Sequence, residues 1–172
     1  MGKYDALNYA DRALKLTGEN GAFLVTGKGG KNVMTIGYSA QAVMWYRSVF
    51  IVPVRENRFT HTILETDKEF TVFVPSEKMT REIILCGSKS GRDTDKFALC
   101  GFQLLPSEAV EVPHISGNGF VYECRILYET NIDPDKLLDW SLVKSDYSAS
   151  DAGLTHTLYF AEILNAYESK SL

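Results

Sequence analysis

The sequence has no long apolar run and no paired cysteine motif. No stretch reaches the roughly 20 apolar residues that a membrane-spanning helix needs, and charged residues occupy the N-terminal segment where a secretory signal would be apolar. The three cysteines, Cys86, Cys100 and Cys124, are widely spaced and form no CxxC pair, which indicates neither a zinc site nor a disulfide framework. We therefore expect buried free thiols, a cytoplasmic location and no membrane contact.

An excess of positive charge is absent as well. The formal net charge is -4, whereas a general nucleic-acid binder needs a basic face that displaces counterions from phosphates. We therefore expect no nucleic-acid partner. A single phosphate group needs only a few donors, so a local basic cluster remains compatible with this composition.

Several chemical signatures are missing. The sequence contains no GxGxxG, GxxxxGK[ST], HExxH or GxSxG motif. The "GKGG" at 27–30 lacks the spacing of a phosphate loop and is better interpreted as a hairpin turn. His61, His114 and His156 do not have the spacing of metal ligands, so we expect no metal site and assign no catalytic residue.

Short apolar runs dominate what is present. The 172 residues are typical of one domain, and we take 1–172 as a single domain with an N-terminal helix at 4–16. Because the strands do not alternate with long helices, a parallel doubly wound sheet is disfavoured. We predict a mainly β fold with short helices, an antiparallel barrel over about 20–165. The predicted strands are 22–26, 32–39, 48–54, 69–75, 120–130 and 156–164, with an extended segment at 110–115, helices at 58–66, 76–86 and 94–101, a helical turn at 134–140 and a polar loop at 145–153.

The segment "KNVMTIGYS" at 31–39 is an unusual strand. Strict alternation places Asn32 and Met34 on one face and Thr35 on the other, so both faces mix polar and apolar residues. A plain core strand separates the two more cleanly. The pattern favours a strand that lines a ligand. Because Asn32 and Thr35 would both have to reach that ligand, we expect an irregular stretch near Met34 to Gly37.

Two further segments carry donors suited to a phosphate. Arg58 and Thr60 lie at a predicted strand-to-helix junction, where free N–H groups and the helix dipole favour an anion. Ser90 and Lys96 belong to a second basic loop, "KSGRDTDK" at 89–96. Each segment alone is typical of a solvated loop. Together with the strand at 31–39, they favour one phosphorylated, planar ligand.

Four motifs, in order along the chain, resemble those of the flavin reductase-like, FMN-binding split-barrel proteins, and of the flavoredoxin group in particular. "NVMTIGYS" at 32–39 resembles the first signature of that family. "RFTHTILETDKEFTVFVPS" at 58–76 is similar to its Arg-aromatic-Thr motif and the strand that follows. "SGRDTDKF" at 90–97 and "HTLYFAEIL" at 156–164 resemble its Ser-Gly-x-x-x-Asp-Lys-Phe element and its closing strand. The resemblance spans about residues 20–165.

The resemblance implies an antiparallel split β-barrel that binds FMN at the interface of a homodimer. It also implies an NAD(P)H-dependent flavin or ferric reductase, or a flavoredoxin-type oxidoreductase, with NAD(P)H as electron donor and free flavin, ferric iron or a protein as acceptor. Carried over by position, the FMN-binding residues would be Asn32, Met34, Thr35, Tyr38 and Ser39 around the ring and ribityl chain, Arg58, Thr60, Ser90 and Lys96 near the phosphate, and Phe160 near the ring.

Two alternatives stay open. The same pocket would serve a non-enzymatic FMN electron carrier, and a relative without flavin would bind another planar ligand such as haem through His61 or His156. Three residues depart from the family pattern: Tyr38 stands where Trp is frequent, Pro75 replaces Asn and Ala161 replaces Gly. We expect Ala161 to crowd the flavin or a nicotinamide. Turnover with NAD(P)H therefore separates the reductase from the carrier.

Overall fold

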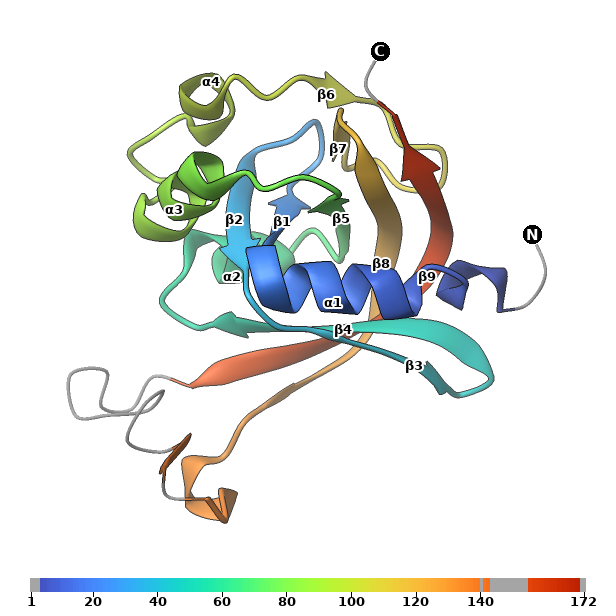
Figure 1. Ribbon diagram of the computed structural model, residues 1–172. Coiled ribbons are helices and arrows are strands. Elements are labelled where there is room, and N and C mark those ends of the chain that lie inside the picture. Colours follow the sequence, from blue (N-terminus) through green and yellow to red (C-terminus); the bar gives the residue numbers. More distant parts are fainter. Residues whose placement is uncertain (1–3, 140, 143–154, 171–172) are drawn as a thin grey trace.

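A computed structural model describes residues 4–139, 141–142 and 155–170 (Figure 1). The predicted polar loop at 145–153 lies outside the described residues. The predicted turn at 134–140 is described except for its last residue and contains the 3-10 helix η2 (Pro134–Lys136). Within the described ranges, no helix is both long and apolar enough to cross a membrane.

Seven strands form one antiparallel sheet in the order β2-β1-β5-β8-β9-β4-β3. The sheet curls around an apolar interior without closing, because β2 and β3 remain its two edges in the described part of the chain (Figure 1). This architecture confirms the predicted split barrel. The strands are β1 (Ala22–Thr26), β2 (Asn32–Ile36), β3 (Ala40–Met44), β4 (Arg47–Arg55), β5 (Glu69–Pro75), β8 (Gly119–Asn131) and β9 (His156–Ser169), and a separate pair consists of β6 (Leu104–Leu105) and β7 (His114–Ile115).

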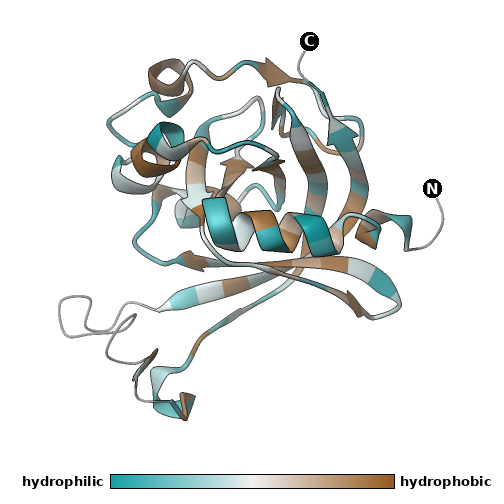
Figure 2. Ribbon diagram, in the orientation of Figure 1, coloured by the Kyte–Doolittle hydropathy of each residue, from teal (hydrophilic) through white to brown (hydrophobic). Residues whose placement is uncertain are grey.

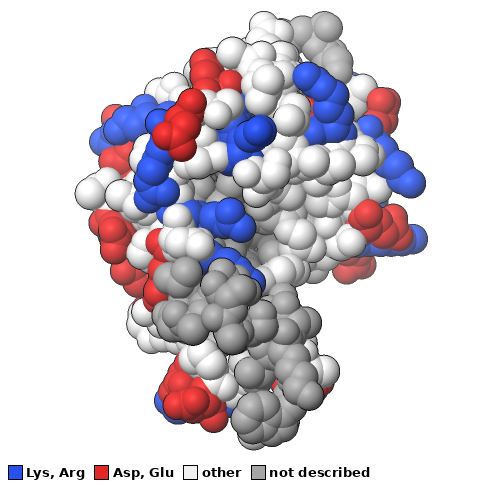
Figure 3. Space-filling model, turned by 90° about the vertical axis from the view of Figure 1, so that its left-hand side faces the viewer, with Lys and Arg blue, Asp and Glu red and all other residues white. Residues whose placement is uncertain are grey.

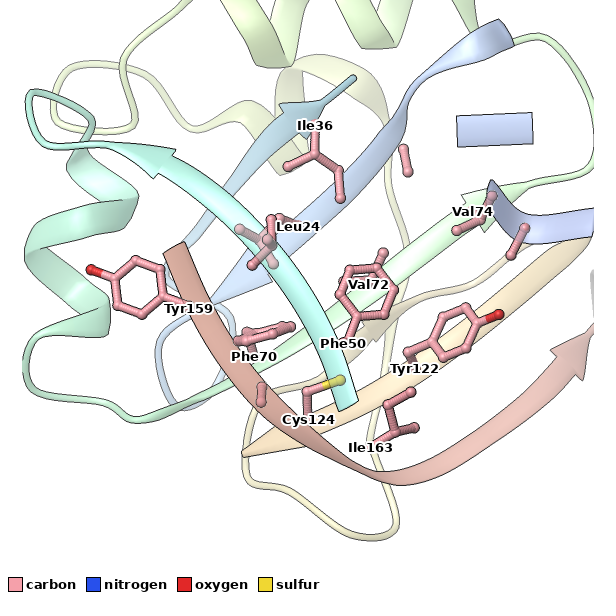
Figure 4. Close-up of a cluster of buried hydrophobic side chains, with 14 of the residues drawn as sticks. Leu24, Ile36, Phe50, Phe70, Val72, Val74, Tyr122, Cys124, Tyr159 and Ile163 are labelled. Atoms are coloured by element: carbon pink, nitrogen blue, oxygen red, sulfur yellow. The ribbon is translucent and has the colours of Figure 1, made fainter. Parts of the chain in front are cut away.

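Alternate residues of the strands fill the barrel. Leu24, Val72 and Tyr122 are fully buried in the interior cluster shown in Figure 4. Phe23 and Val121 belong instead to a second buried cluster, to which α3 (Thr80–Ser88) and α4 (Lys96–Cys100) contribute. The strand β1 is thus buried on both faces, which explains its almost uniformly apolar sequence (Figure 2). Each such side chain contributes about 1.5–3 kcal/mol by leaving water.

The N-terminal helix differs from the predicted range of 4–16. A short 3-10 helix, η1 (Asp5–Leu7), comes first, and α1 (Ala10–Asn20) follows it and lies across one end of the curled sheet (Figure 1). The helix continues past its predicted end at residue 16, and Thr17 is buried within it. It ends at Gly21, whose φ of 81° is a conformation that suits glycine.

The remaining helices confirm the predicted ones with shifted ends. The helix α3 begins at Thr80 with Met79 at its N-cap, so the predicted start at residue 76 is wrong. The Ser76 N–H donates instead to the carbonyl of Asn118 at 2.9 Å, which holds the chain extended after β5. The helix runs on to Ser88, past its predicted end at residue 86. The helix between β4 and β5 is α2 (Phe59–Leu64).

Strand ends also differ from the predictions. The strand β2 stops at Ile36, and residues 40–44 form the unpredicted edge strand β3. Asn32 and Met34 pair with β1 in unbroken register through to Ile36, so the irregular stretch expected near Met34 to Gly37 is wrong as far as Ile36. The closing strand β9 runs past residue 164 to Ser169, because it pairs with β8 along nearly its whole length.

Candidate functional site

A pocket of about 220 Å³ lies along the edge strand β2; we call it the main pocket. The start of α2, the end of α3 and the loop 89–95 also line it. Because β2 is an edge strand, side chains from both of its faces reach this pocket. Asn32 turns towards α2, and Thr35 turns towards α3, where its Oγ1 donates to the carbonyl of Ile83 at 2.6 Å. A regular edge strand therefore brings Asn32 and Thr35 to the same pocket, which was expected to require an irregular stretch.

The main pocket is strongly basic. Four cations line it, and no Asp or Glu does so among the described residues. Figure 3 shows Lys and Arg side chains gathered around the hollow on the corresponding face of the molecule. In a chain with a net charge of -4, this is a local reversal of sign that favours an anionic ligand. The four cations are Arg58, Lys89, Arg92 and Lys96.

Lys96 is the most enclosed of these cations, with only 4% of its surface exposed. Its Nζ donates to the carbonyl of Cys86 at 3.3 Å and to that of Lys89 at 3.4 Å. Burial lowers the pKa of Lys96 below its usual value, and the positive charge of Arg58 lowers it further. An ammonium group has three donors, so one remains for a ligand. A bound anion would offset the cost of burying this charge.

Asn32 is enclosed to a similar extent, at 2% exposed. Its Nδ2 donates to Thr60 Oγ1 at 2.7 Å, whereas its Oδ1 has no hydrogen-bond partner among the described residues. Gly91 approaches this oxygen so closely that a Cβ at Gly91 would stand 2.0 Å from it. Buried polar atoms are rarely left unpaired. A ligand in the main pocket is therefore the natural partner for this amide.

Arg92 fastens the loop 89–95 to the start of α2. Its guanidinium donates to the carbonyl of Asn57 at 3.4 Å and to Thr62 Oγ1 at 3.2 Å. The same group lies over the ring of Phe59, 5.2 Å from its centroid. These contacts hold the two basic segments of the chain against each other and shape the pocket between them.

A second, smaller pocket of about 110 Å³ adjoins the main one and shares Met34, Thr35 and Arg58 with it. Tyr38 and His156 also line this adjoining pocket, and the Tyr38 hydroxyl lies 3.1 Å from His156 Nε2. Neither pocket alone reaches the about 300–1,000 Å³ typical of cofactor sites. A cofactor-sized ligand would therefore extend beyond either of these two pockets, and the residues that they share connect them.

Most of the predicted site residues come together here. Tyr38 lines the adjoining pocket, while Ser39 and Phe160 line neither pocket. Ser39 lies just before β3, with its Oγ enclosed and without a partner among the described residues. The seven that line the main pocket are Asn32, Met34, Thr35, Arg58, Thr60, Ser90 and Lys96.

Phe160 lies farther along the face of β4 and β9 that borders the adjoining pocket. Pro53 lines that pocket, and Ile51, two residues earlier in β4, pairs with Phe160. The Phe160 ring packs against Tyr128 at 5.6 Å and Trp45 at 6.2 Å between centroids. It is thus part of an aromatic cluster at a distance from the basic pocket, on a face that is continuous with the adjoining pocket.

Two of the departures from the family pattern lie away from both pockets. Ala161 is fully buried in the barrel interior, so the expectation that it crowds a ligand in the site is wrong. Its neighbour Phe160 points to the opposite face because side chains alternate along a strand. Pro75 ends β5 opposite Gly119 and lines neither pocket.

The histidines considered for haem are engaged by protein side chains. His61 Nε2 lies 3.1 Å from Thr157 Oγ1, and His156 Nε2 contacts Tyr38. Over the described ranges, no group of three or more His, Cys, Asp or Glu residues is placed to hold a metal ion.

Sequence reasoning placed Lys89 and Arg92 in the second basic loop but gave them no contact with the cofactor, and it did not single out the ring of Phe59. The sequence did indicate them indirectly, because Phe59 follows Arg58 and the two cations lie in the basic loop. Spacing along a loop does not say which side chains turn inward, so these residues were not separable from solvated ones.

Comparisons with known proteins identify the family and the fold. Residues 19–172 match the family model described as "Flavin reductase like domain". A curated relative from Archaeoglobus fulgidus, named only as an uncharacterized protein, is 27% identical over 106 residues, which cover 62% of this chain and 59% of the relative. The matched part therefore spans less than two thirds of that relative's length.

The solved structures that share the fold include the following three. Flavoredoxin of Desulfovibrio vulgaris has a TM-score of 0.65 at 19% identity, covering 87% of this chain and 69% of its own. The FMN-binding domain of a flavin reductases-like enzyme from Shewanella baltica has a TM-score of 0.63 at 18% identity, and the match covers 93% of this chain and 74% of that domain's chain. The NADH:FAD oxidoreductase of Streptomyces globisporus has a TM-score of 0.63 at 15% identity, and the match covers 87% of this chain and 75% of the oxidoreductase chain. These likenesses show the fold, and the family model adds membership: the chain belongs to the flavin reductase-like domain family.

Proposed function

We propose that this protein is an FMN-binding oxidoreductase whose cofactor spans both pockets, with the FMN phosphate in the main pocket. One observation carries the proposal: four cations line the main pocket, and no carboxylate does so among the described residues. A phosphate there would compensate the buried charge of Lys96. Family membership, and the FMN-binding domain of Shewanella baltica with the same fold, support FMN over an unrelated phosphorylated ligand.

The residues present fit the parts of FMN. Arg58 and Lys96 would hold the phosphate, with the Ser90 hydroxyl beside them. Asn32 and Thr35 would contribute polar contacts along the edge of β2. The rest of the cofactor would extend past the residues shared by the two pockets into the adjoining pocket, where Tyr38 and His156 pair. Contacts of Ser39, Thr60, Met34 and Phe160 with FMN remain predictions.

When bound, FMN supplies the chemistry by which a hydride from NAD(P)H is accepted and electrons pass to free flavin, ferric iron or a protein. The chain supplies binding and a positive field at the phosphate. Ala161, which was expected to interfere with a nicotinamide, faces the barrel interior. For this reason we favour the reductase over the non-enzymatic electron carrier. A cytoplasmic location remains part of the prediction.

The proposal includes a homodimer. The face of β4 and β9 that borders the adjoining pocket continues through Ile51 and Phe160 to Trp45 and Tyr128, which are 52% and 51% exposed. Contiguous exposed apolar surface of this kind is typical of an interface. A second copy seated there would cover Phe160 next to the flavin site. Tyr128→Asp should convert the dimer to a monomer in sedimentation, and a wild-type protein that sediments as a monomer at high concentration contradicts the proposal.

The binding test compares FMN with riboflavin, which lacks the phosphate. Wild-type protein should bind FMN more tightly, as followed by flavin fluorescence. Arg58→Ala should lose about tenfold or more of the FMN affinity, the equivalent of one charge-assisted hydrogen bond, and much less of the riboflavin affinity. Lys28→Ala is the matched control, because Lys28 pairs with Glu111 outside both pockets. Equal affinity for the two flavins would refute the phosphate assignment, and a protein that takes up neither would refute the function.

The activity test starts from the FMN-loaded protein under anaerobic conditions. Addition of NADH or NADPH should bleach the visible flavin absorbance if the protein is a reductase. A flavin that dithionite bleaches, while neither nicotinamide does, supports the electron carrier instead.

A further inference from the structure

Cys86 and Cys100 lie side by side at the wall of the main pocket. Their sulfur atoms are 3.7 Å apart. Cys86 belongs to α3 and lines the main pocket, and Cys100 is the last residue of α4. A disulfide has an S–S distance of about 2.05 Å, so a closure of roughly 1.7 Å would join them. The sequence spacing gave no reason to pair these cysteines, because 13 other residues, 87–99, separate them.

We propose that Cys86 and Cys100 form a reversible disulfide that fastens α4 to α3. The chain between the two cysteines is the basic loop with its flanking turns, and it contributes every pocket cation except Arg58. The bond would therefore tie together the two ends of the segment that forms one wall of the main pocket. The pocket residues between the two cysteines include Lys89, Ser90, Gly91, Arg92 and Lys96.

Exposure of the two thiols sets the order of the reaction. Cys100 is half-buried, whereas Cys86 is only 1% exposed. A small disulfide such as oxidised glutathione would therefore meet Cys100 first. The Cys100 thiolate attacks one sulfur of the small disulfide, forms a mixed disulfide and releases one thiol. The Cys86 thiolate then attacks the Cys100 sulfur and releases the second thiol.

This exchange balances without a further reactant. One protein dithiol and one small disulfide become one protein disulfide and two small thiols. The two protons lost by the cysteines end on the two released thiols, and the electron pair passes to the small disulfide. Reduction by a small dithiol reverses the exchange.

The pKa values of the two thiols determine how fast the disulfide forms. Burial raises the pKa of Cys86 to about 12 and also raises the pKa of Cys100, while the charge of Lys96 partly opposes both shifts. Because the thiolate is the reactive form, cross-linking should be slow at neutral pH and should accelerate as pH rises.

Cys124 provides an internal control. It is fully buried in the barrel interior, in a different cluster from the one that contains Cys86. Burial raises the pKa of Cys124 well above its ordinary value, so it should remain a free thiol under oxidant.

The first experiment exposes native protein to oxidised glutathione, blocks free thiols with iodoacetamide and maps the peptides by mass spectrometry. Wild-type protein should yield Cys86 linked to Cys100. Cys86→Ser should accumulate a glutathione adduct on Cys100, and Cys100→Ser should leave Cys86 unmodified. A persistent glutathione adduct on wild-type Cys100, linkage to Cys124, or unreacted thiols after prolonged exposure at raised pH would each overturn the disulfide.

The second experiment measures hydrogen exchange in the loop 89–95 before and after oxidation. The linked wild-type protein should exchange these amides several-fold more slowly, because joining the two ends of a segment restricts its opening. Cys100→Ser treated in the same way should show no change. If the loop amides exchange hydrogen equally fast in linked and reduced wild-type protein, the proposal that the disulfide restrains this loop is wrong. If the function proposed above is correct, the Cys86–Cys100 disulfide restrains one wall of the phosphate site. Neither experiment uses flavin, so the disulfide proposal and the functional proposal can fail independently.

Discussion

The Asn32 amide donates to Thr60 Oγ1 at 2.7 Å and thereby joins the edge strand β2 to α2 in a buried contact between residues 28 positions apart. This bond fixes one polar face of the main pocket. It also aims the other atom of the amide at the loop that carries Gly91. One hydrogen bond thus couples the packing of two elements to the polar lining of the site.

Removal of either partner should destabilise the fold. Asn32→Ala leaves the Thr60 hydroxyl buried and unpaired, and Thr60→Val does the same to the Asn32 amide. Each should cost about 1–3 kcal/mol of unfolding free energy, measured by urea denaturation. The double variant should cost clearly less than the two single costs added together, because both report the same bond. Additive costs would show that the two side chains do not interact.

Lys96→Met should separate stability from binding. The substitution removes a buried charge whose pKa burial lowers, so the melting temperature of the ligand-free protein should stay the same or rise. The FMN affinity should fall by about tenfold or more, because a charged hydrogen-bond donor is lost. Calorimetry and flavin titration measure the two effects. A variant that melts earlier and binds FMN normally would make Lys96 a structural residue.

Gly91→Ala should distort the main pocket, whereas Gly87→Ala should not. A Cβ at Gly91 would lie 2.0 Å from Asn32 Oδ1, while a Cβ at Gly87 meets Thr35 at an ordinary 3.6 Å. Both glycines line the same pocket. We expect a loss of FMN affinity in Gly91→Ala and near-normal affinity in Gly87→Ala, by flavin titration. Equal behaviour of the two variants would argue against the close packing of Gly91 on Asn32.

His114 should make stability depend on pH. It is 6% exposed and lies 3.2 Å from the Tyr167 hydroxyl, and burial lowers its pKa below the ordinary 6.5. The unfolded chain therefore binds its proton more readily than the folded chain. This contribution to stability is complete above pH 6.5 and is lost as pH falls towards the folded pKa.

His114→Gln removes that contribution. The free energy of unfolding should fall less for the variant than for wild type between about pH 7.5 and about pH 5. Urea denaturation at several pH values measures the difference, in which other titrating groups largely cancel. Parallel curves for the two proteins would show that His114 titrates alike in both states.

The fold was largely predictable where local pattern and tertiary environment agree. Strands 22–26 and 69–75 have the predicted ends, because their apolar residues are buried on both faces. Helix ends were less predictable. A helix was predicted to start at residue 76, yet the Ser76 N–H bonds to Asn118 and α3 begins only at Thr80, and α1 runs past the predicted end at 16 to Asn20. Such contacts between distant segments leave no local pattern in the sequence.

The sequence by itself determined most of the strands, though not β3, together with the basic residues and the order of the motifs, because apolar alternation and residue chemistry are local properties. Only the tertiary structure decided that β2 is an edge strand, and hence that Asn32 and Thr35 reach one pocket from opposite faces. It also decided which lysine is buried, and that Cys86 and Cys100 touch. Burial and proximity depend on how distant segments pack, and the spacing of residues along the chain does not encode them one by one.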